Sequence, residues 1–416
     1  MKSTARIFGL FAFVFIISVA GLAEATEGTL DWHQWRGPNR DGVSAETGLL
    51  KQWPAQGPEL AWKVSGLGGG YSGISVADGR IYTMGDGPDG CNLEALDVAG
   101  GKPIWSTKIG APGGGGGYPG PRCTPTVDGG MIYALGQFGD LVCVDVASGK
   151  ERWHKNLKKD FAGVMMSGWG YAESPLVDGN NVICTPGGAQ GTLAALNKTS
   201  GELVWRSKEF TDKAAYASLI VEEIGGVRQY IQLTDASVAG ISAADGRLLW
   251  KAPRVGATAV IPTPVFFDNQ VFVTSGYGIG CNLFKIAATG GQFTAEQVYA
   301  NKNLVNHHGG VVLVDGYIYG TGDPLTCLEL NTGKVMWKNP CVGKGSVTCA
   351  DGHLYVRSEG GPVALVEVSS KGYVEKGRFN QPERSDKNSW PHPVIVGGKL
   401  YLRDQDKLFC YDVKAK

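Results

Sequence analysis

Two adjacent histidines, His307 and His308, lie in the segment NHHGG at residues 306–310 of a chain that has only six histidines. An imidazole can bind a metal ion or exchange a proton near neutral pH. Successive side chains of an extended segment point to opposite sides, so the sequence predicts no metal site shared by this pair. We expect one imidazole to face a ligand and the other to anchor the loop through a backbone carbonyl or a carboxylate.

Other candidate residues occupy equivalent places in a repeat. When the chain is aligned on a recurring Asp-Gly turn, aromatic, cationic and acidic residues stand just before the first strand of most repeats. A purely structural join would more often hold Gly, Pro, Ser or Asn. We therefore interpret these residues, with two tyrosines on the same face, as one ligand site: Tyr71, Arg122, Tyr171, Glu173, Tyr216, Tyr277, His307, His308, Lys344, Trp390 and His392. Asp235 and Asp323, in other connections on that face, could contribute acid groups, and no catalytic residue can be assigned.

The elements that position these residues are short strands. Each repeat has four strand-length apolar runs separated by turns. The first run ends in a hairpin dipeptide such as Asp78-Gly79. A turn such as Asp145–Lys150 precedes the fourth run; its Asp can bond the turning backbone and its Gly accepts a positive φ. A tryptophan such as Trp105 usually closes the fourth run and can pack between neighbouring sheets.

The repeats predict a closed ring of sheets. Seven complete repeats lie between residues 71 and 379, and residues 391–413 supply three more strands. The segment ELAWKV, residues 59–64, reads as the missing fourth strand, and its pairing would leave no open sheet edge. Four-stranded repeats of this kind are typical of β-propellers. We predict an all-β fold: an eight-bladed β-propeller of four-stranded antiparallel blades, the last closed by an N-terminal strand.

The first residues match an export signal, with two positive charges, an apolar run and the small-x-small triplet Ala23-Glu24-Ala25. The run is shorter than the roughly 20 apolar residues of a spanning helix. We predict a signal peptide at 1–25, an N-terminal extension at 26–58 and a single propeller at 59–416. The mature chain would have no transmembrane segment, and it would be periplasmic or secreted, since no cysteine follows the apolar run for lipid attachment.

Composition excludes some functions. The 39 Lys and Arg balance 39 Asp and Glu, so the basic excess of a nucleic-acid-binding protein is missing. Nine cysteines are present, but no haem-attachment motif or paired CxxC motif. Cys143, Cys327 and Cys410 alternate with apolar residues, so we expect them to be free core thiols. A bridge between Cys341 and Cys349 stays open.

The pattern DGxIY…ALDxxTGKxxW, which recurs between residues 59 and 413, resembles the PQQ-type repeat of the quinoprotein alcohol dehydrogenase-like propellers. That superfamily includes PQQ-dependent alcohol dehydrogenases and the propeller lipoprotein of the outer-membrane barrel-assembly machine. The segment WHQWRGPNRDGVS, residues 32–44, resembles the start of exported PQQ-like repeat proteins. The repeat consists of turn and core residues, so it is specific for the fold and weakly specific for activity.

The resemblance implies a quinoprotein site only in part. Dehydrogenases of this kind typically use a vicinal cysteine pair, a stacking Trp, a Ca²⁺ site with Glu and Asn, and a catalytic Asp, whereas no adjacent cysteines occur here. We therefore predict a monomeric ligand- or protein-binding module without a cofactor. Its funnel mouth would take a small molecule, a carbohydrate or an envelope protein. The alternatives are a quinoprotein-type oxidoreductase with PQQ and Ca²⁺, and a metal-assisted hydrolase or lyase using His307 or His308; whether the chain is an enzyme stays open.

Overall fold

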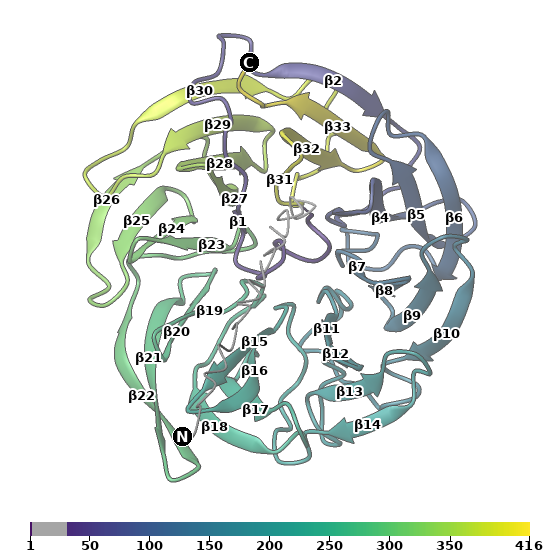
Figure 1. Ribbon diagram of the computed structural model, residues 1–416, viewed down its shortest axis with the longest axis vertical. Coiled ribbons are helices and arrows are strands. Elements are labelled where there is room, and N and C mark those ends of the chain that lie inside the picture. Colours follow the sequence, from purple (N-terminus) through teal and green to yellow (C-terminus); the bar gives the residue numbers. More distant parts are fainter. Residues whose placement is uncertain (2–30) are drawn as a thin grey trace.

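The computed structural model describes residues 31–416 together with Met1. The predicted signal peptide, apart from Met1, and the first residues of the predicted extension lie outside the described residues. All regular structure in the described part is β-structure, arranged as eight sheets around a central axis (Figure 1). None of the described residues forms a helix that could cross a membrane.

The first four blades follow one another along the chain, each with four strands in sequence order. Blade 1 consists of β3 (Ser75–Ala77), β4 (Arg80–Asp86), β5 (Cys91–Asp97) and β6 (Pro103–Gly110). Blade 2 consists of β7 (Thr126–Asp128), β8 (Met131–Leu135), β9 (Asp140–Asp145) and β10 (Glu151–Asn156). Blade 3 consists of β11 (Leu176–Asp178), β12 (Asn181–Cys184), β13 (Ala194–Asn197) and β14 (Leu203–Arg206). Blade 4 consists of β15 (Ile220–Ile224), β16 (Val227–Leu233), β17 (Ser237–Ser242) and β18 (Leu248–Pro253).

The next three blades repeat this order, and one of them gains a short parallel strand, β1 (Val43–Ser44). Blade 5 consists of β19 (Val265–Phe267), β20 (Gln270–Ser275), β21 (Gly280–Thr289) and β22 (Gln292–Asn301). Blade 6 consists of β23 (Val311–Val314), β24 (Tyr317–Thr321), β25 (Leu325–Glu329) and β26 (Val335–Asn339). Blade 7 consists of β27 (Gly345–Ala350), β28 (His353–Ser358), β29 (Pro362–Glu367) and β30 (Glu375–Asn380).

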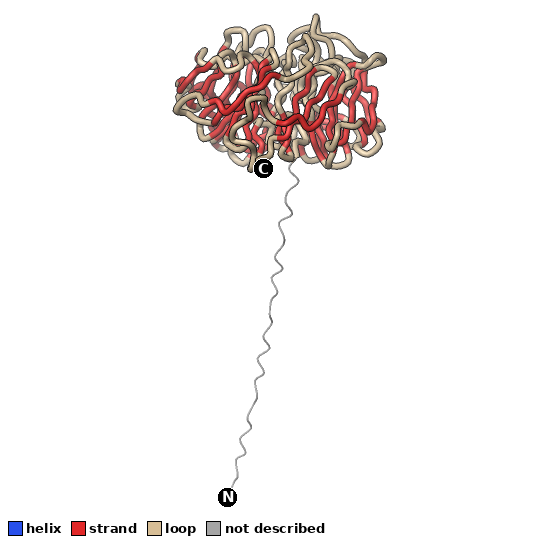
Figure 2. Tube along the Cα trace, turned by 90° about the horizontal axis from the view of Figure 1, so that it is seen from above, coloured by secondary structure: helices blue, strands red, loops and turns tan. Residues whose placement is uncertain are grey.

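Blade 8 joins the two ends of the propeller. Its inner strands are β31 (Val394–Val396), β32 (Lys399–Asp404) and β33 (Lys407–Asp412), and its outer strand is β2 (Glu59–Val64). β2 pairs antiparallel with β33, from Glu59 opposite Asp412 to Val64 opposite Leu408. The predicted eight-bladed fold and its composite last blade are confirmed. In the side view the strands form a thick disc with loops on both faces (Figure 2).

Neighbouring blades meet through the aromatic residue that ends one blade and the turn of the next. Trp105 donates its indole N–H to the Val146 carbonyl across the blade 1–blade 2 interface, at 3.0 Å. Gly149 of that turn has a φ of +71° and lies so close to the indole that a Cβ would come within 2.7 Å of the ring. Gly201 lies in the same way against Trp153, and Gly246 against Trp205. The repeated tryptophan and the repeated glycine are therefore two halves of one contact.

The N-terminal extension enters the ring. Residues 32–46, which we call the axial segment, run among the innermost strands near the axis, where β1 lies parallel to β27 (Figure 1). The sequence left open whether residues 32–44 lie inside the channel or along the outside. The axial segment makes hydrogen bonds to seven of the eight blades, at Val76, Val127, Ser174, Thr263, Val311, Cys349 and Ile395. It therefore lies inside the channel and ties the blades together.

All nine cysteines lie in the described residues, and all are free. Cys143, Cys327 and Cys410 are buried in their blades, as predicted. Cys341 and Cys349 do not form the bridge that the sequence left open.

Candidate functional site

The connections that lead into the first strands meet at one end of the axis, together with several second-to-third connections. They surround a pocket of about 380 Å³, which is a typical size for a small-molecule site. Most of the predicted residues line this pocket: Tyr71, Arg122, Tyr216, Tyr277, His307, His308, Lys344, Trp390 and His392. We call the face that holds this pocket the mouth face.

Tyr171 and Glu173 lie elsewhere, buried in the interior next to the pocket-lining Ala172. The Tyr171 hydroxyl donates to the Pro186 carbonyl at 3.0 Å, inside the blade 2–blade 3 interface. Burial raises the pKa of the Glu173 carboxyl to about 8, despite the charge of Arg40 nearby. Side chains alternate along this stretch, so the residues on either side of Ala172 point away from the pocket.

Both histidines of NHHGG line the pocket, and the Nδ1 atoms of His307 and His308 lie 3.3 Å apart. The expectation that they point to opposite sides is therefore wrong, because the chain bends through residues 307–309 and is not extended. The two glycines permit this bend. A Cβ on Gly309 would overlap the Gly345 carbonyl of blade 7, and Gly310 has a φ of +63° with the Arg36 guanidinium beside it.

The environment of the histidines keeps their rings neutral. Burial, with the nearby Lys344 ammonium, lowers the pKa of His307 to about 4. Burial and the Arg36 guanidinium lower the pKa of His392 to about 3. Arg36 can only donate, so His392 accepts at Nδ1 (3.1 Å) and donates from Nε2 to the His308 carbonyl at 3.0 Å. Neutral imidazoles offer lone pairs, so this wall of the pocket is better suited to coordination than to proton donation.

One acidic side chain, Glu359, lies next to these histidines. Its Oε1 accepts from the Trp390 indole N–H at 2.8 Å and pairs with the Lys344 ammonium at 3.1 Å. The same oxygen lies 3.4 Å from His308 Nδ1. The sequence did not point to Glu359, which stands in an ordinary-looking SEGG turn between β28 and β29. Asp235 and Asp323, the acids named from the sequence, do not line the pocket.

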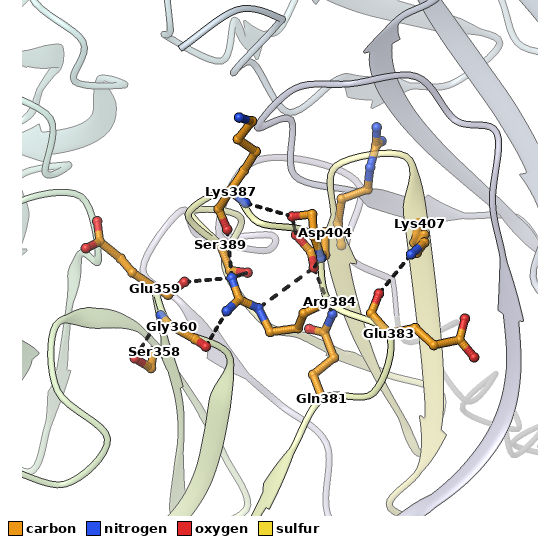
Figure 3. A network of polar contacts seen from close by, with 12 residues as sticks. Ser358, Glu359, Gly360, Gln381, Glu383, Arg384, Lys387, Ser389, Asp404 and Lys407 are labelled. Carbon is orange, nitrogen blue, oxygen red and sulfur yellow. Dashed lines mark hydrogen bonds and ion pairs between the residues drawn. The ribbon is translucent and has the colours of Figure 1, made fainter. Parts of the chain in front are cut away.

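A network around Arg384 holds Glu359 and Trp390 in place (Figure 3). The guanidinium donates to the carbonyls of Glu359 (3.1 Å), Gly360 and Lys387 (2.7 Å). The backbone N–H of Ser389 also donates to the Glu359 carbonyl, at 3.1 Å. Arg384 therefore fastens the β28–β29 turn to the segment that carries Trp390, while the Glu359 carboxylate points away from the network (Figure 3).

Aromatic rings form one wall of the pocket. The Trp390 ring lies 4.2 Å from that of Tyr71 and 5.0 Å from that of Tyr118, measured between centroids. Trp169 lies against Tyr216, at 6.3 Å. Sequence reasoning missed Tyr118 and Trp169, although both stand in glycine-rich segments, GGGGGYPG and SGWGY, that lead toward a first strand.

The axial segment provides the lower wall. Trp35 lines the pocket, and its ring centroid lies 4.7 Å from that of His392. Its indole N–H donates to Thr263 Oγ1 at 2.9 Å, which fixes the ring beneath blade 5. Arg36 is 3% exposed and donates to the carbonyls of Asp41 (2.8 Å) and Val311 (2.5 Å). Trp35 and Arg36 belong to the segment WHQWRGPNR, which stands out in the sequence only for its resemblance to the start of exported PQQ-like repeat proteins. No local pattern in this segment indicates that it enters the channel.

Arg122 is the notable cation of the aromatic wall. Its guanidinium lies over the Tyr71 ring, 5.8 Å from the centroid, and donates to the carbonyls of Tyr118 (2.6 Å) and Gly120 (3.2 Å). Among the described residues, no carboxylate lies within ion-pair distance of it. Burial lowers its pKa from the usual range. The site therefore presents a partly desolvated positive charge without an acidic partner.

Known proteins share this fold and parts of this sequence. The serine/threonine-protein kinase AfsK of Streptomyces griseus is 32% identical over 163 residues, which are 38% of this chain and 19% of the kinase. The outer membrane protein assembly factor BamB of Shewanella oneidensis is 24% identical over 274 residues, 61% of this chain and 64% of that protein. The chain thus matches less than two thirds of either relative.

Among solved structures, the quinohemoprotein alcohol dehydrogenase of Comamonas testosteroni superimposes with a TM-score of 0.65 and 13% identity. The superposition covers 93% of this chain and 81% of the dehydrogenase, and it shows the shared fold. The PQQ_2 family model, described as outer membrane protein assembly factor BamB, matches residues 89–339 and 307–415. These matches span most of the propeller, and the chain belongs to the PQQ_2 family of PQQ-repeat β-propellers.

Proposed function

We propose that this propeller is a binding module whose pocket takes a small anionic molecule that carries a ring. The observation that carries the proposal is Arg122, a partly buried guanidinium that faces the pocket and has no carboxylate partner among the described residues. A charge in such a place is costly to desolvate unless an opposite charge joins it. A carboxylate or phosphate on the ligand would supply that charge, in the bidentate geometry that arginine favours.

The aromatic wall supports the presence of a ring in the ligand. Tyr71, Tyr118 and Trp390 lie within 6.5 Å of one another, between centroids, and present broad apolar surface beside the guanidinium. Such surfaces bind sugar rings and planar aromatic molecules. We expect the module to work outside the cytoplasm, because residues 1–25 have the pattern of a signal peptide and a relative is an outer membrane protein assembly factor.

The residues do not fit the calcium-held quinone of the related dehydrogenases. None of the nine cysteines is bonded to another, and no aspartate lines the pocket that the described residues form. Ca²⁺ requires six to eight oxygen ligands, whereas the one carboxylate here, Glu359, already pairs with Lys344. We therefore derive no oxidation step for this chain, and PQQ enters only as one planar anion among the ligands to be tested.

Matched pairs of neutral and acidic ligands test the proposal. Calorimetry would compare glucose with glucuronate, and indole-3-acetamide with indole-3-acetate, alongside PQQ. We expect the acidic member of at least one pair to bind. Arg122→Gln should weaken that binding about 10- to 100-fold, as expected when a charged hydrogen bond is lost. Arg152→Gln is the control, because Arg152 pairs with Asp145 far from the pocket.

Two outcomes would contradict the proposal. The neutral and acidic members could bind equally well, or Arg122→Gln could leave the affinity of the acidic member unchanged. The melting temperature of each variant shows whether a loss of binding reflects unfolding.

A second candidate function is the docking of an envelope protein on the same face. The connections around the pocket expose Tyr118, Phe138, Val164, Val255 and Tyr277, the last three by 41%, 76% and 51%. Exposed apolar side chains gathered on one face are typical of protein interaction sites. A photocrosslinker at position 255 should then capture a partner, while one at Phe267, which is equally apolar but on the opposite face, should not.

A further inference from the structure

Three side chains in one wall of the pocket have the arrangement of a metal site: His307, His308 and Glu359. We infer that they bind a divalent transition-metal ion, with Zn²⁺ the best match, through the two Nδ1 atoms and one carboxylate oxygen. Two imidazoles and a carboxylate are donors that Zn²⁺ accepts and that Mg²⁺ and Ca²⁺ do not favour. Three protein ligands would leave a fourth coordination position open toward the pocket.

The distances between the donor atoms carry the inference. Nitrogen and oxygen ligands lie about 2.0–2.2 Å from Zn²⁺ in a tetrahedral site, so two such donors are about 3.3–3.6 Å apart. The two Nδ1 atoms are 3.3 Å apart, and His308 Nδ1 lies 3.4 Å from Glu359 Oε1. The ligand atoms of all three residues lie within 4.8 Å of one another.

The surroundings hold the donors in this arrangement. His307 Nε2 bonds to the Tyr277 hydroxyl at 3.0 Å, and Nδ1, next to His308 Nδ1, is the ring nitrogen that a metal ion would take. Outer partners orient metal-bound histidines in this way. The Glu359 carboxylate is oriented by the Trp390 indole N–H. His308 is 6% exposed, and Asn306 fastens the loop by donating to the Gly310 carbonyl at 2.9 Å. The site is thus assembled from blades 5, 6, 7 and 8.

Lys344 is the competing cation. Its ammonium lies 3.1 Å from Glu359 Oε1, and its side chain is 36% exposed. A bound metal ion would repel this ammonium, which can turn toward solvent or toward an anion in the mouth because its stem is flexible. Metal binding and the ammonium therefore compete for the same carboxylate. It follows that removing the positive charge of Lys344 should strengthen metal binding, whereas removing a ligand should weaken it.

Titration of the full-length protein with Zn²⁺ alone, and with Co²⁺ for its absorption spectrum, tests the site without any organic ligand. We expect one ion per chain and the intense visible bands of tetrahedral Co²⁺. His307→Gln and Glu359→Gln should each weaken binding about 100-fold or more, and Tyr277→Phe about 10-fold. Lys344→Met should tighten it about 10-fold through the lost repulsion.

His154→Gln is the matched control. His154 also lies between two carboxylates, Asp140 at 3.1 Å and Glu151 at 3.2 Å, but on separate ring nitrogens and on an outer strand, so its loss should leave the titration unchanged. The inference fails if Co²⁺ stays octahedral, if His307→Gln and His154→Gln lose equal affinity, or if Lys344→Met weakens binding. The inference does not rest on the proposed anion site, since binding of the metal alone and the effect of Arg122→Gln on organic anions are measured separately.

Discussion

The two faces of the propeller are built in different ways. On the face opposite the mouth, which we call the turn face, each of the eight blades has a two-residue turn after its first strand, and a glycine-containing turn precedes the fourth strand of blades 1 to 7. Asp78-Gly79 and Asp315-Gly316 both have positive φ at both residues, the conformation of a type I′ hairpin. Gly149 lies against Trp105 as Gly201 lies against Trp153.

On the mouth face, the connections differ in length and in the side chains that they bring to the pocket. The connection before β7 brings Arg122, the one before β23 brings two histidines, and the one before β31 brings Trp390. Their contacts run between blades and to the axial segment, as between Arg36 and His392. The comparison teaches that the repeated residues of this protein hold the ring together, while the residues that vary between repeats form the pocket.

A substitution on the turn face should affect stability and leave binding intact. Gly149→Ala would place a Cβ within 2.7 Å of the Trp105 ring at a φ of +71°. We expect a loss of about 3–4 kcal/mol in the free energy of unfolding, from overpacking and backbone strain together. Chemical denaturation measures it. Gly129→Ala is the control, because Gly129 has a φ of +55° but nothing near the added Cβ, and it should lose about 1 kcal/mol. Equal losses in the two variants would show that the contact with Trp105 does not contribute to the effect.

A substitution in the axial segment should affect both properties. Arg36→Met would leave the acceptors at Asp41, Val311 and His392 without their donor in a buried place. We expect about 2–3 kcal/mol less stability, and weaker binding in the pocket because His392 and Trp35 form its lower wall. Chemical denaturation measures the loss of stability, and calorimetry on the same variant measures its affinity for ligands of the pocket. Full affinity at reduced stability would show that the axial segment only ties the blades together.

A buried acid near the mouth should make stability depend on pH. The pKa of Glu173 is about 8 in the folded protein, well above its ordinary value of 4.5, so the folded state keeps a proton that the unfolded state releases. The free energy of unfolding should therefore fall by about 4 kcal/mol as pH rises from about 4.5 to 8. Chemical denaturation over this pH range measures the decrease, and Glu173→Gln should abolish it. If the variant shows the same decrease, Glu173 is not its cause.

The smallest expected effect on stability lies in the network of Figure 3. Arg384→Ala would free the β28–β29 turn from the segment that carries Trp390. We expect about a 10-fold loss of affinity for anions in the pocket, because Trp390 and Glu359 would no longer be held in place, and at most about 1 kcal/mol in unfolding. If the variant binds anions with unchanged affinity, the contacts of Trp390 with Tyr71 and Tyr118 are sufficient to position it without Arg384.

The sequence alone determined the architecture of this protein. The period of the repeat, the Asp-Gly and Ser-Gly-Lys turns and the closing tryptophan depend on residues that lie near one another in the chain. Their geometry follows from local rules on φ, hairpins and alternation. The composite blade could also be predicted, because residues 59–64 read as a fourth strand without the three strands that should precede it.

The tertiary structure alone decided which side chains meet in the pocket. Alternation counted from a strand failed for His307 and His308, because the chain bends where Gly309 approaches the Gly345 carbonyl of blade 7. Glu359 reaches the histidines from another blade, and the axial segment reaches seven blades at once. Irregular loops take their direction from neighbours that are distant in the sequence, so no local pattern could place these residues.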